Sequence, residues 1–497
     1  MAEETQEATE TLTISNFLSS MRFAEDVPEH KPMLGGDFDQ IEEGVSTEQR
    51  FVSGLAALVS NMDPEQGKFD KASIQDLVQT IDQLVNDQLN EVIHNAEFQE
   101  LESTWRGIDD LCKNTNFGAN IEYSILDVRK VELMEDLEDN TADIAGSALF
   151  KKVYVSEYDQ YGGKPYGGMI GMYEFGNTPD DLLFLRTMGK VATASHAPFV
   201  GSASAQFFGC KDMAEVAQLR DIEGLMSQPK YGTWNALRDS EEAAYIGLAL
   251  PKYIARLPYH PETNPCRTIN FTEEVRGDLD SQYLWGNAVM LHARNMAKSF
   301  ESSGWCQYMR GPKGGGLISG LPVHTFNLRG EEEIKIPVEI TIPDYRELEF
   351  AKCGFIPLVY RKGTGDAVFF SVQSIKSPKT FKDPKDTENA HLVTNLTYCY
   401  SISRIAHYLK CIMRDNIGSS ADGDYVANQI DTWISRYITT VQNPDDLTLR
   451  YYPFKAYSID VNAIDGKPGW YDCKLSILPH IQFEGMDVEL RIESRLG

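Results

Sequence analysis

Histidine, cysteine and serine side chains that could catalyse a reaction or bind a metal occur throughout this 497-residue sequence, but their spacing matches none of the usual motifs. The nine histidines form no HxH or HxxxH pair and the eight cysteines form no CxxC pair, so the paired ligands of a zinc site are missing. Ser195 and His196 are neighbours in the sequence, whereas the members of a catalytic triad meet only in the folded chain. We therefore expect reduced thiols, no metal, no cofactor and no catalytic residues.

The glycine-rich stretch at residues 311–316 is a candidate for binding phosphate through a nest of backbone N–H groups. No helix start follows it within a few residues, and the motifs GxxxxGK[ST], HExxH and GxSxG are absent from the sequence. A loop that needs the conformational freedom of glycine is the alternative. These observations favour a structural or interaction protein, with a cytosolic enzyme as the rival of a different class.

Acidic residues are concentrated in the first third of the chain. The net charge is −28, and residues 1–150 alone hold 32 acidic and nine basic side chains. Such an excess argues against nucleic acid or an anionic membrane as the main partner. No apolar run approaches the roughly 18 residues of a membrane span. The first 30 residues contain neither the basic region nor the apolar region that a signal peptide has. We expect a cytoplasmic protein without membrane insertion.

Changes in composition and periodicity divide the chain into four parts. Residues 1–45 read as an acidic, largely disordered arm, because loop-forming proline and glycine occur among many acids. Residues 46–118 show helical periodicity, and residues 119–390 alternate between strand-like and helix-like patterns. Residues 391–497 combine two helices with a terminal hairpin and strand.

Two apolar stripes with helical spacing run through the helical region. The first consists of Ile74, Leu77, Val78, Ile81, Leu84, Val85, Leu89 and Val92, and the second of Phe98, Leu101, Trp105, Ile108 and Leu111. Polar residues fill the gaps, so each stripe forms one face of a helix. These faces pack either within the chain or against a helix from a partner subunit. We predict the second outcome for Ile74, Leu77, Ile81 and Leu84.

The middle of the chain predicts an α/β (α+β) body with a mixed sheet. The predicted strands are residues 121–128, 169–175, 245–250, 305–309, 338–342, 355–360 and 368–372, and the predicted helices are residues 180–195, 286–302, 344–353, 394–417 and 425–440. Strands that alternate with helices are typical of a layered body of this class.

The last 50 residues alternate with the period of a strand. The apolar positions are Tyr457, Ile459 and Val461, then Tyr471, Cys473, Leu475 and Ile477, and finally Met486, Val488, Leu490 and Ile492. The turn signal at residues 465–469 joins the first two sets into a hairpin. A small sheet of this kind leaves free edges that can bind another strand. We predict that neighbouring protomers complete it and that the strand from Met486 to Ile492 links protomers.

Nine segments in order resemble the large subunit of the type VI secretion contractile sheath, the TssC/VipB family. They are LESTWRGIDDLC (101–112), YGGKPYGGMIGMYEF (161–175), VATASHAPFVGSAS (191–204), WNALRDSEEAAYIGLALPKYIARLPY (234–259), YLWGNAVML (283–291), GWCQYMRGPKGGGLISGLPVHTF (304–326), CGFIPLVYRKGTGDAVFFSVQS (353–374), SRIAHYLKCIMRDNIG (403–418) and PGWYDCKLSILPHIQFEGMDVELRI (468–492). Ordered agreement over much of the chain is more specific than a short motif.

The resemblance implies a structural role and a set of partners. It implies pairing with a small sheath subunit of the TssB/VipA type, through the helical region, and stacking of the pairs into a six-fold helical lattice. The lattice would surround an inner tube of Hcp, grow from a baseplate in the bacterial cytoplasm, contract to propel the tube, and be recycled by a ClpV-type AAA+ unfoldase. A phage-tail-like sheath or the sheath of an extracellular contractile injection particle is the alternative.

A basic stripe stands out near the end of this acidic chain. Arg404, His407, Lys410 and Arg414 are spaced three, three and four residues apart, which places them on one side of a helix. The resemblance implies that a C-terminal helix touches the tube, so we predict these four residues as tube-facing. A solvated face or an intrachain partner such as Asp415 is the alternative.

Overall fold

The computed structural model of the chain describes most residues from 71 to 480. The described residues are 71–267, 269–277, 279–379, 381–382, 390–417, 422–439, 441, 444–464 and 471–480. They form two compact units: one holds the described residues up to Ser103 with Arg256–Leu284 and His324–Lys335, and the other holds the remainder. The predicted arm at residues 1–45 lies outside the described residues. The four-part division stays a prediction, and its bounds differ from those of the two units.

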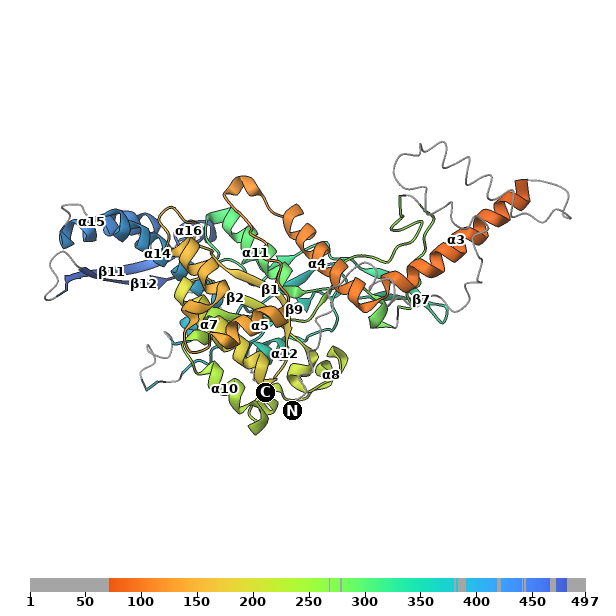
Figure 1. Cartoon of the computed structure of the whole chain (residues 1–497), viewed down its shortest axis with the longest axis horizontal. Coiled ribbons are helices and arrows are strands. Elements are labelled where there is room, and N and C mark those ends of the chain that lie inside the picture. Colours follow the sequence, from red (N-terminus) through yellow and green to blue (C-terminus); the bar gives the residue numbers. More distant parts are fainter. Residues whose placement is uncertain are drawn as a thin grey trace, which may run out of the picture. The chain divides into compact units, whose positions relative to one another are not determined.

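The smaller unit is built on a long helix, α3 (Lys71–Ile93), and the beginning of α4 (Ala96–Lys113) (Figure 1). The side chain of Asn95 accepts hydrogen bonds from the first amides of α4, which starts that helix where the chain turns. The unit also contains the short helix η9 (Asp280–Gln282) and the hairpin of β7 (His324–Leu328) and β8 (Glu331–Lys335).

The larger unit contains a six-stranded mixed sheet. Its strand order is β1 (Met169–Phe175), β2 (Phe199–Ala203), β3 (Ile246–Leu250), β9 (Ile356–Tyr360), β10 (Ala367–Phe369) and β6 (Leu317–Ile318). The first four strands are parallel, and β10 is antiparallel to both of its neighbours. β1 therefore forms one edge of the sheet in the described chain.

Helices cover both faces of this sheet, as Figure 1 shows for α7 and α11. Phe199 and Leu248 pack into a core with α7 (Pro179–Ser195), whereas Val200 and Ala249 pack into a second core with α11 (Ala288–Ser303). Successive strand residues point to opposite faces, so a strand buried on both sides serves both cores. The expected α/β class is confirmed.

Shorter helices complete the larger unit. They are η3 (Phe117–Ala119), α5 (Lys130–Asp139), η4 (Ile144–Gly146), α6 (Ala148–Phe150), the π-helix η5 (Lys151–Tyr158), η6 (Ala205–Phe208), α8 (Met213–Gln218), α9 (Ile222–Met226), η7 (Pro229–Tyr231), α10 (Gly232–Arg238), η8 (Glu242–Tyr245) and α12 (Asp344–Lys352). A two-stranded ladder pairs β4 (Tyr253–Ile254) with β5 (Trp285–Gly286).

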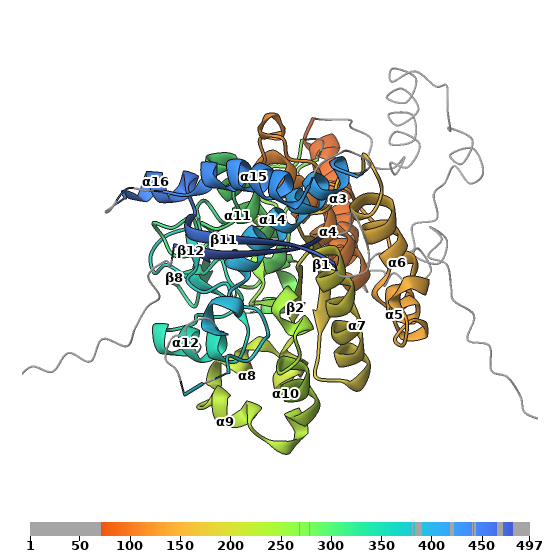
Figure 2. The same ribbon diagram turned by 90° about the vertical axis from the view of Figure 1, so that its left-hand side faces the viewer.

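The end of the chain forms a helix pair and a long hairpin (Figure 2). The elements are α14 (Leu396–Asp415), α15 (Gly423–Ile434), η10 (Ser435–Tyr437), α16 (Asp446–Tyr451), β11 (Phe454–Ala463) and β12 (Tyr471–Pro479). A small core joins them, with Trp305, Ile405, Ile434 and Phe454 buried at its centre. The predicted hairpin is confirmed, and the turn at residues 465–469 lies outside the described residues.

Three of the predicted strands are wrong. Residues 121–128 are assigned to no strand. Residues 305–309 are fixed instead by Ser299, whose hydroxyl donates to the carbonyl of Trp305 and accepts from the amide of Tyr308. Residues 338–342 contribute a single bridge, between Val338 and Tyr253. The apolar residues of 121–128 are largely exposed, and those of the other two places are buried without forming a strand, so periodicity alone mistook all three for strands.

Candidate assembly surfaces

Ser195 and His196 have structural roles at the end of α7. The Ser195 hydroxyl donates to the carbonyl of Val191 at 2.8 Å, one turn earlier in α7. His196 closes the helix in the left-handed conformation, with φ of 48°, and its Nδ1 lies 3.2 Å from the hydroxyl of Tyr245. Burial lowers the pKa of His196. The serine hydroxyl is therefore committed to its own helix and does not face the histidine as a nucleophile would.

The glycine-rich stretch at residues 311–316 uses its amides within the loop. The amide of Gly311 donates to the carbonyl of Phe369 at 2.7 Å, and the amide of Gly316 donates to Gly311 at 2.9 Å. Gly315 has φ of 93°, and a Cβ there would lie 2.2 Å from the carbonyl oxygen of Tyr308. Close backbone approach explains the glycines, which supports the loop alternative over a phosphate nest.

The described ranges contain neither the side-chain cluster of a metal site nor a helix suited to crossing a membrane. Within the described ranges, no group of three or more histidine, cysteine or carboxylate side chains could hold a metal ion. Over the same part of the chain, every helix is too short or too polar to span a bilayer.

The basic residues at the end of α14 dock onto the π-helix η5 and the residues after it. Lys410 Nζ lies 2.7 Å from Asp159 Oδ1 and 3.9 Å from the centre of the Tyr158 ring. Arg414 donates to the carbonyls of Tyr158 and Gln160 at 3.0 and 2.9 Å. Together these contacts clamp α14 to the start of the larger unit.

The other two residues of the basic stripe are also engaged within the chain. The guanidinium of Arg404 stacks 4.7 Å from the ring of Trp305 and 4.9 Å from that of Phe300. His407 Nε2 lies 3.0 Å from the carbonyl oxygen of Ser195. Burial lowers the pKa of His407 to about 4, so this residue is neutral at pH 7.

The stripe of Arg404, His407, Lys410 and Arg414 therefore does lie along one side of α14, but each member has a partner in the same chain. The acidic partner is Asp159 and not Asp415, which sequence spacing had suggested. The tube-facing role stays a prediction. Spacing along the sequence could not predict this clamp, because its two halves are about 250 residues apart.

The apolar stripe of α3 is partly open to solvent. Val78, Ile81 and Val85 are 45%, 41% and 40% exposed, and Leu84 is half-buried. Ile74 lies in the same helix, as does Leu77, but their side chains are outside the described residues. Their spacing places the three exposed residues on one face. An exposed row of branched aliphatic side chains is suited to contact with another chain.

A different face of α3 is anchored inside its own unit. The buried Asn90 accepts a hydrogen bond from the amide of Glu274 at 2.8 Å and donates to the carbonyl of Thr272 at 3.2 Å. One turn further along, the helix ends beside His94, whose Nε2 lies 3.5 Å from Glu273. The end of α3 is thereby fixed while its apolar stripe stays exposed.

A buried ion cluster fixes the segment that packs on this helix. Arg256 contacts Glu102 at 2.7 Å and Glu273 at 2.5 Å, and all three side chains are largely buried. Burial acts to raise the pKa of Glu273, but the neighbouring His94 and Arg256 outweigh it and lower that pKa. No local sequence pattern predicts this cluster, because its members lie far apart along the chain.

The hairpin of β11 and β12 has one packed face and one polar face. Tyr457 pairs with Ile477 and Ile459 with Leu475, and these side chains pack toward the C-terminal core. The opposite face carries exposed polar residues such as Lys474 and Ser476. The predicted inter-protomer strand, Met486, Val488, Leu490 and Ile492, lies outside the described residues. The register of the described hairpin matches the predicted alternation.

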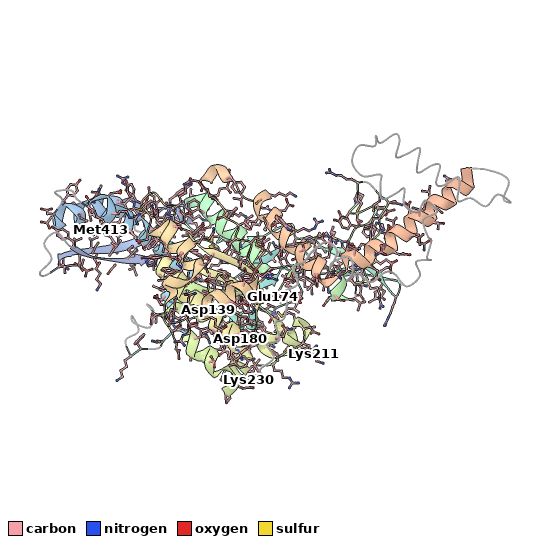
Figure 3. All side chains as sticks on the ribbon, viewed as in Figure 1. Asp139, Glu174, Asp180, Lys211, Lys230 and Met413 are labelled. Carbon is pink, nitrogen blue, oxygen red and sulfur yellow. The ribbon has the colours of Figure 1, made fainter. Side chains whose placement is uncertain are left out.

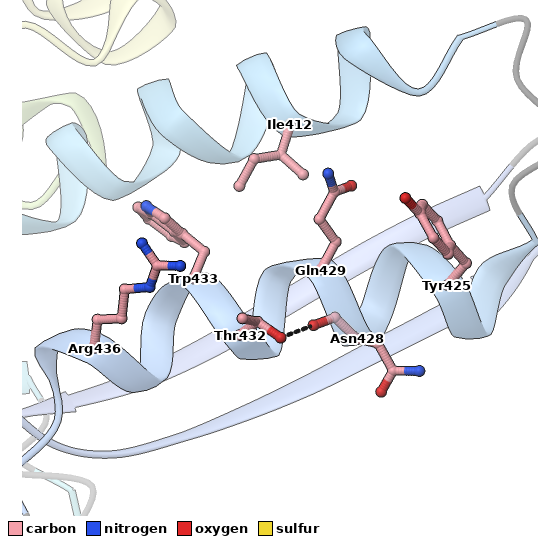
Figure 4. Close-up of a pocket in the computed structure, with 7 residues that line it drawn as sticks. All are labelled: Ile412, Tyr425, Asn428, Gln429, Thr432, Trp433 and Arg436. Carbon is pink, nitrogen blue, oxygen red and sulfur yellow. Dashed lines mark hydrogen bonds between the residues drawn. The ribbon is translucent and has the colours of Figure 1, made fainter.

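An open groove of about 450 Å³ lies between α14 and α15 (Figure 4). Its lining residues are Ile412, Tyr425, Asn428, Gln429, Thr432, Trp433 and Arg436. Met413 lies on the same helix as Ile412 (Figure 3). The lining mixes aromatic and amide side chains and lacks the clustered acids, thiols or imidazoles of a reactive centre.

Comparisons with known proteins identify the family of this chain. Residues 75–376 match the VipB family description "EvpB/VC_A0108, tail sheath N-terminal domain", and residues 385–496 match "EvpB/VC_A0108, tail sheath gpW/gp25-like domain". The chain is 37% identical over 473 residues to the type VI secretion system sheath protein TssC1 of Pseudomonas aeruginosa, covering 94% of this chain and 93% of that protein.

Two chains in solved structures of the anti-feeding prophage align with this chain at low TM-scores. A chain in the baseplate of the anti-feeding prophage aligns with a TM-score of 0.35 and 11% identity, over 76% of this chain and 84% of that one. A chain in the contracted helical sheath of the same particle aligns with a TM-score of 0.28 and 11% identity, over 64% of this chain and 76% of that one.

The two family matches together span most of the chain, and both are to domains of tail sheaths, so the molecule is a sheath subunit. The chain belongs to the VipB family of tail sheath proteins. The resemblance found in the sequence is confirmed, as is the expected function of a large subunit of a contractile sheath. The family and the name of the relative indicate a structural protein.

Proposed function

We propose that this chain is the large sheath subunit of a type VI secretion system, which pairs with a small sheath subunit and polymerises around an inner tube. The observation that carries the proposal is the nearly full-length similarity to a type VI secretion sheath protein. The free energy for contraction would be stored in the assembled lattice. This chain would then need no nucleotide site, which agrees with the closed glycine loop at residues 311–316.

The exposed stripe of α3 is the proposed binding surface for a helix of the small subunit. Val78, Ile81 and Val85 each keep about two fifths of their surface in solvent. Covering the remaining area would contribute about 1 kcal/mol for each side chain. The anchored face of the helix, with Asn90, holds the stripe in a fixed orientation. A preformed apolar helix face suits docking of a second amphipathic helix.

Co-expression with the small subunit tests this assignment. We expect the double change Ile81→Asp and Val85→Asp to abolish co-purification, because two charges would be buried without partners. The matched control is Gln83→Asp, which adds a charge on a different, exposed face of α3 and should leave co-purification intact. An insoluble double variant would favour packing within the chain, and co-purification at the wild-type level would reject the surface.

We infer a second assembly surface at the C-terminal hairpin. The edges of β11 and β12 offer backbone groups to further strands, and pairing along an edge connects subunits with little dependence on sequence. The segment with Met486 and Ile492 is the proposed strand from a neighbouring protomer. Deleting residues 486–497 should leave a soluble heterodimer that cannot polymerise; sheaths of normal length from the truncated chain would reject this role.

The remaining partners are proposed from the family resemblance. They are an Hcp inner tube, a baseplate and a ClpV-type unfoldase, in the bacterial cytoplasm. For the tube, Lys410 and Arg414 are the proposed contacts on α14. Because both already bind within the chain, tube binding would have to share or replace those contacts. Electron microscopy of the assembled complex tests whether α14 lines the lumen.

A further inference from the structure

The extended segment at residues 121–127 leaves its backbone unpaired among the residues that the structure describes. Apart from contacts through side chains, these residues make no hydrogen bond to any part of the chain that the structure describes. The segment lies between η3 and α5 in the larger unit. Backbone amides and carbonyls in a folded protein normally have protein or water partners. A row of free backbone groups in an extended segment is the arrangement to which another strand can add.

The side chains of this segment are also unusually apolar for an exposed position. Ile125 is 64% exposed, and Leu126 and Tyr123 are exposed as well. The ring of Phe117, also exposed, packs edge-on against Tyr123 at 5.7 Å. Tyr123 and Ile125 are two residues apart in the extended segment and therefore point to the same side, where the ring of Phe117 contacts Tyr123. Exposed apolar side chains of this kind are ones that a water-soluble subunit would cover by assembly.

Fixed contacts hold the segment in place alongside the edge strand β1. Lys164, which precedes β1, forms an ion pair with Glu122, and Tyr173 donates to the carbonyl of Val128 at 2.7 Å. Just beyond, Lys130 donates to the carbonyl of Glu174. The segment therefore runs in the direction of β1 and is held by side chains at both of its ends. Its backbone is left available.

The acidic residues around the segment favour a partner with basic residues. Asp127 is exposed and forms no ion pair within the described chain, and α5 adds the exposed acids Glu135, Glu138 and Asp139. The first 150 residues carry a net negative charge. A strand whose apolar residues cover Ile125 and whose flanks are basic would complement this surface.

We propose that residues 121–127 form a docking edge for a strand of the small sheath subunit, with basic residues flanking its apolar core. This inference rests on the proposed pairing with that subunit, and it adds a contact separate from α3. Backbone pairing would fix the register of the two chains, while Phe117, Tyr123 and Ile125 would exclude water from one side of the new ladder.

Photo-crosslinking in the co-expressed complex identifies the occupant. A benzophenone amino acid replaces Ile125, with a second probe at Ile81 on α3 and a control probe at the exposed Tyr161. We expect the probe at position 125 to crosslink to the small subunit and the control to remain uncrosslinked. Crosslinking to a second copy of this chain, or no crosslink while the small subunit is captured by the probe at position 81, would overturn the inference. If no small subunit co-purifies with the wild-type chain, the proposed function itself fails.

A proline substitution tests the backbone pairing directly. Ser124→Pro removes one amide hydrogen that has no partner in the free chain, in an extended segment that tolerates proline. We expect it to weaken binding of the small subunit roughly tenfold, whereas Ser124→Ala, which keeps the amide, should bind normally. Hydrogen exchange at residues 121–127 should also slow when the small subunit is bound. Equal binding of the two variants, or unchanged exchange, would overturn the inference.

Discussion

Reversing the charges of Lys410 and Arg414 together should release the end of α14 from η5, even in a complex that contains no inner tube. Lys410→Glu replaces an ion pair with Asp159 by repulsion and removes the cation from the face of Tyr158. Arg414→Glu removes two hydrogen bonds to the carbonyls of Tyr158 and Gln160. The variant therefore loses every polar contact described for these two side chains.

The size of the effect follows from the exposure of the groups. The ion pair is partly exposed and contributes about 0.5 kcal/mol, and the cation over Tyr158 contributes about 1 kcal/mol. The two hydrogen bonds of Arg414 contribute about 1 kcal/mol in total in this exposed setting. Because neighbouring contacts are not additive, we expect the local opening free energy to fall by about 2–3 kcal/mol.

Hydrogen exchange measures this loss where it occurs. A fall of about 2–3 kcal/mol should speed exchange of the amides in α14 and η5 by roughly 30- to 150-fold. The matched control is Arg436→Glu with Lys455→Glu, which changes the net charge equally at two exposed residues of the same region. Unchanged exchange in α14 would refute the clamp, as would equal acceleration in the control.

Three further predictions concern single sites. The pKa of His407 is about 4 in the folded chain, so between pH 6.5 and 5 only the unfolded chain takes up a proton at this residue. The free energy of unfolding of the wild-type chain should therefore fall as the pH is lowered through this window. His407→Asn should make that fall smaller by about 2 kcal/mol, as measured by denaturant titration at each pH. Gly315→Ala should lower the melting temperature more than Gly320→Ala, since a Cβ meets the Tyr308 carbonyl at the first site and open space at the second; equal shifts would contradict this. Arg256→Met should leave two buried carboxylates unpaired, costing about 3–5 kcal/mol, and make residues 256–284 sensitive to limited proteolysis; wild-type resistance would contradict it.

The helices were the part of the fold best predicted from the sequence. The predicted ends of α7 and α14 lie within two residues of the observed ones, because apolar periodicity and capping residues such as Thr178 and Asn395 are local signals. The edge strand β1 was predicted with its observed bounds. α15 was predicted several residues too long at its end.

The errors arose where burial depends on distant parts of the chain. β2 was missed because all five of its residues are buried, so it shows no alternation. The hairpin of β7 and β8 was missed because it is mostly exposed and rich in glutamate, which strands usually avoid. The segment at residues 121–128 alternates like a strand and is extended, but it lacks the partner that would make it one.

The same dependence on distant contacts limits what sequence can say about surfaces. Spacing placed Arg404, His407, Lys410 and Arg414 on one side of a helix, which is correct, but the partners of that side come from residues 158–160 and from α7 and α11. Spacing likewise found the stripe on α3, yet only the structure separates the exposed Ile81 from the half-buried Leu84.

Surfaces that hold the subunit together differ from surfaces that can join subunits in whether their side chains and backbone groups already have partners within the chain. Lys410 and Arg414 have polar partners within the chain, so any contact they make with a tube must compete with Asp159 and two carbonyls. Exposed contacts of this type contribute only about 0–1 kcal/mol each, so exchanging one set for another changes the free energy little and can be reversed. In the part of the chain that the structure describes, the stripe on α3 and the backbone of residues 121–127 have no such internal competitor. Binding a partner at these two surfaces would break no existing contact, so the whole binding free energy would stabilise the complex. This is the property expected of a permanent pair of subunits within a lattice that must also move.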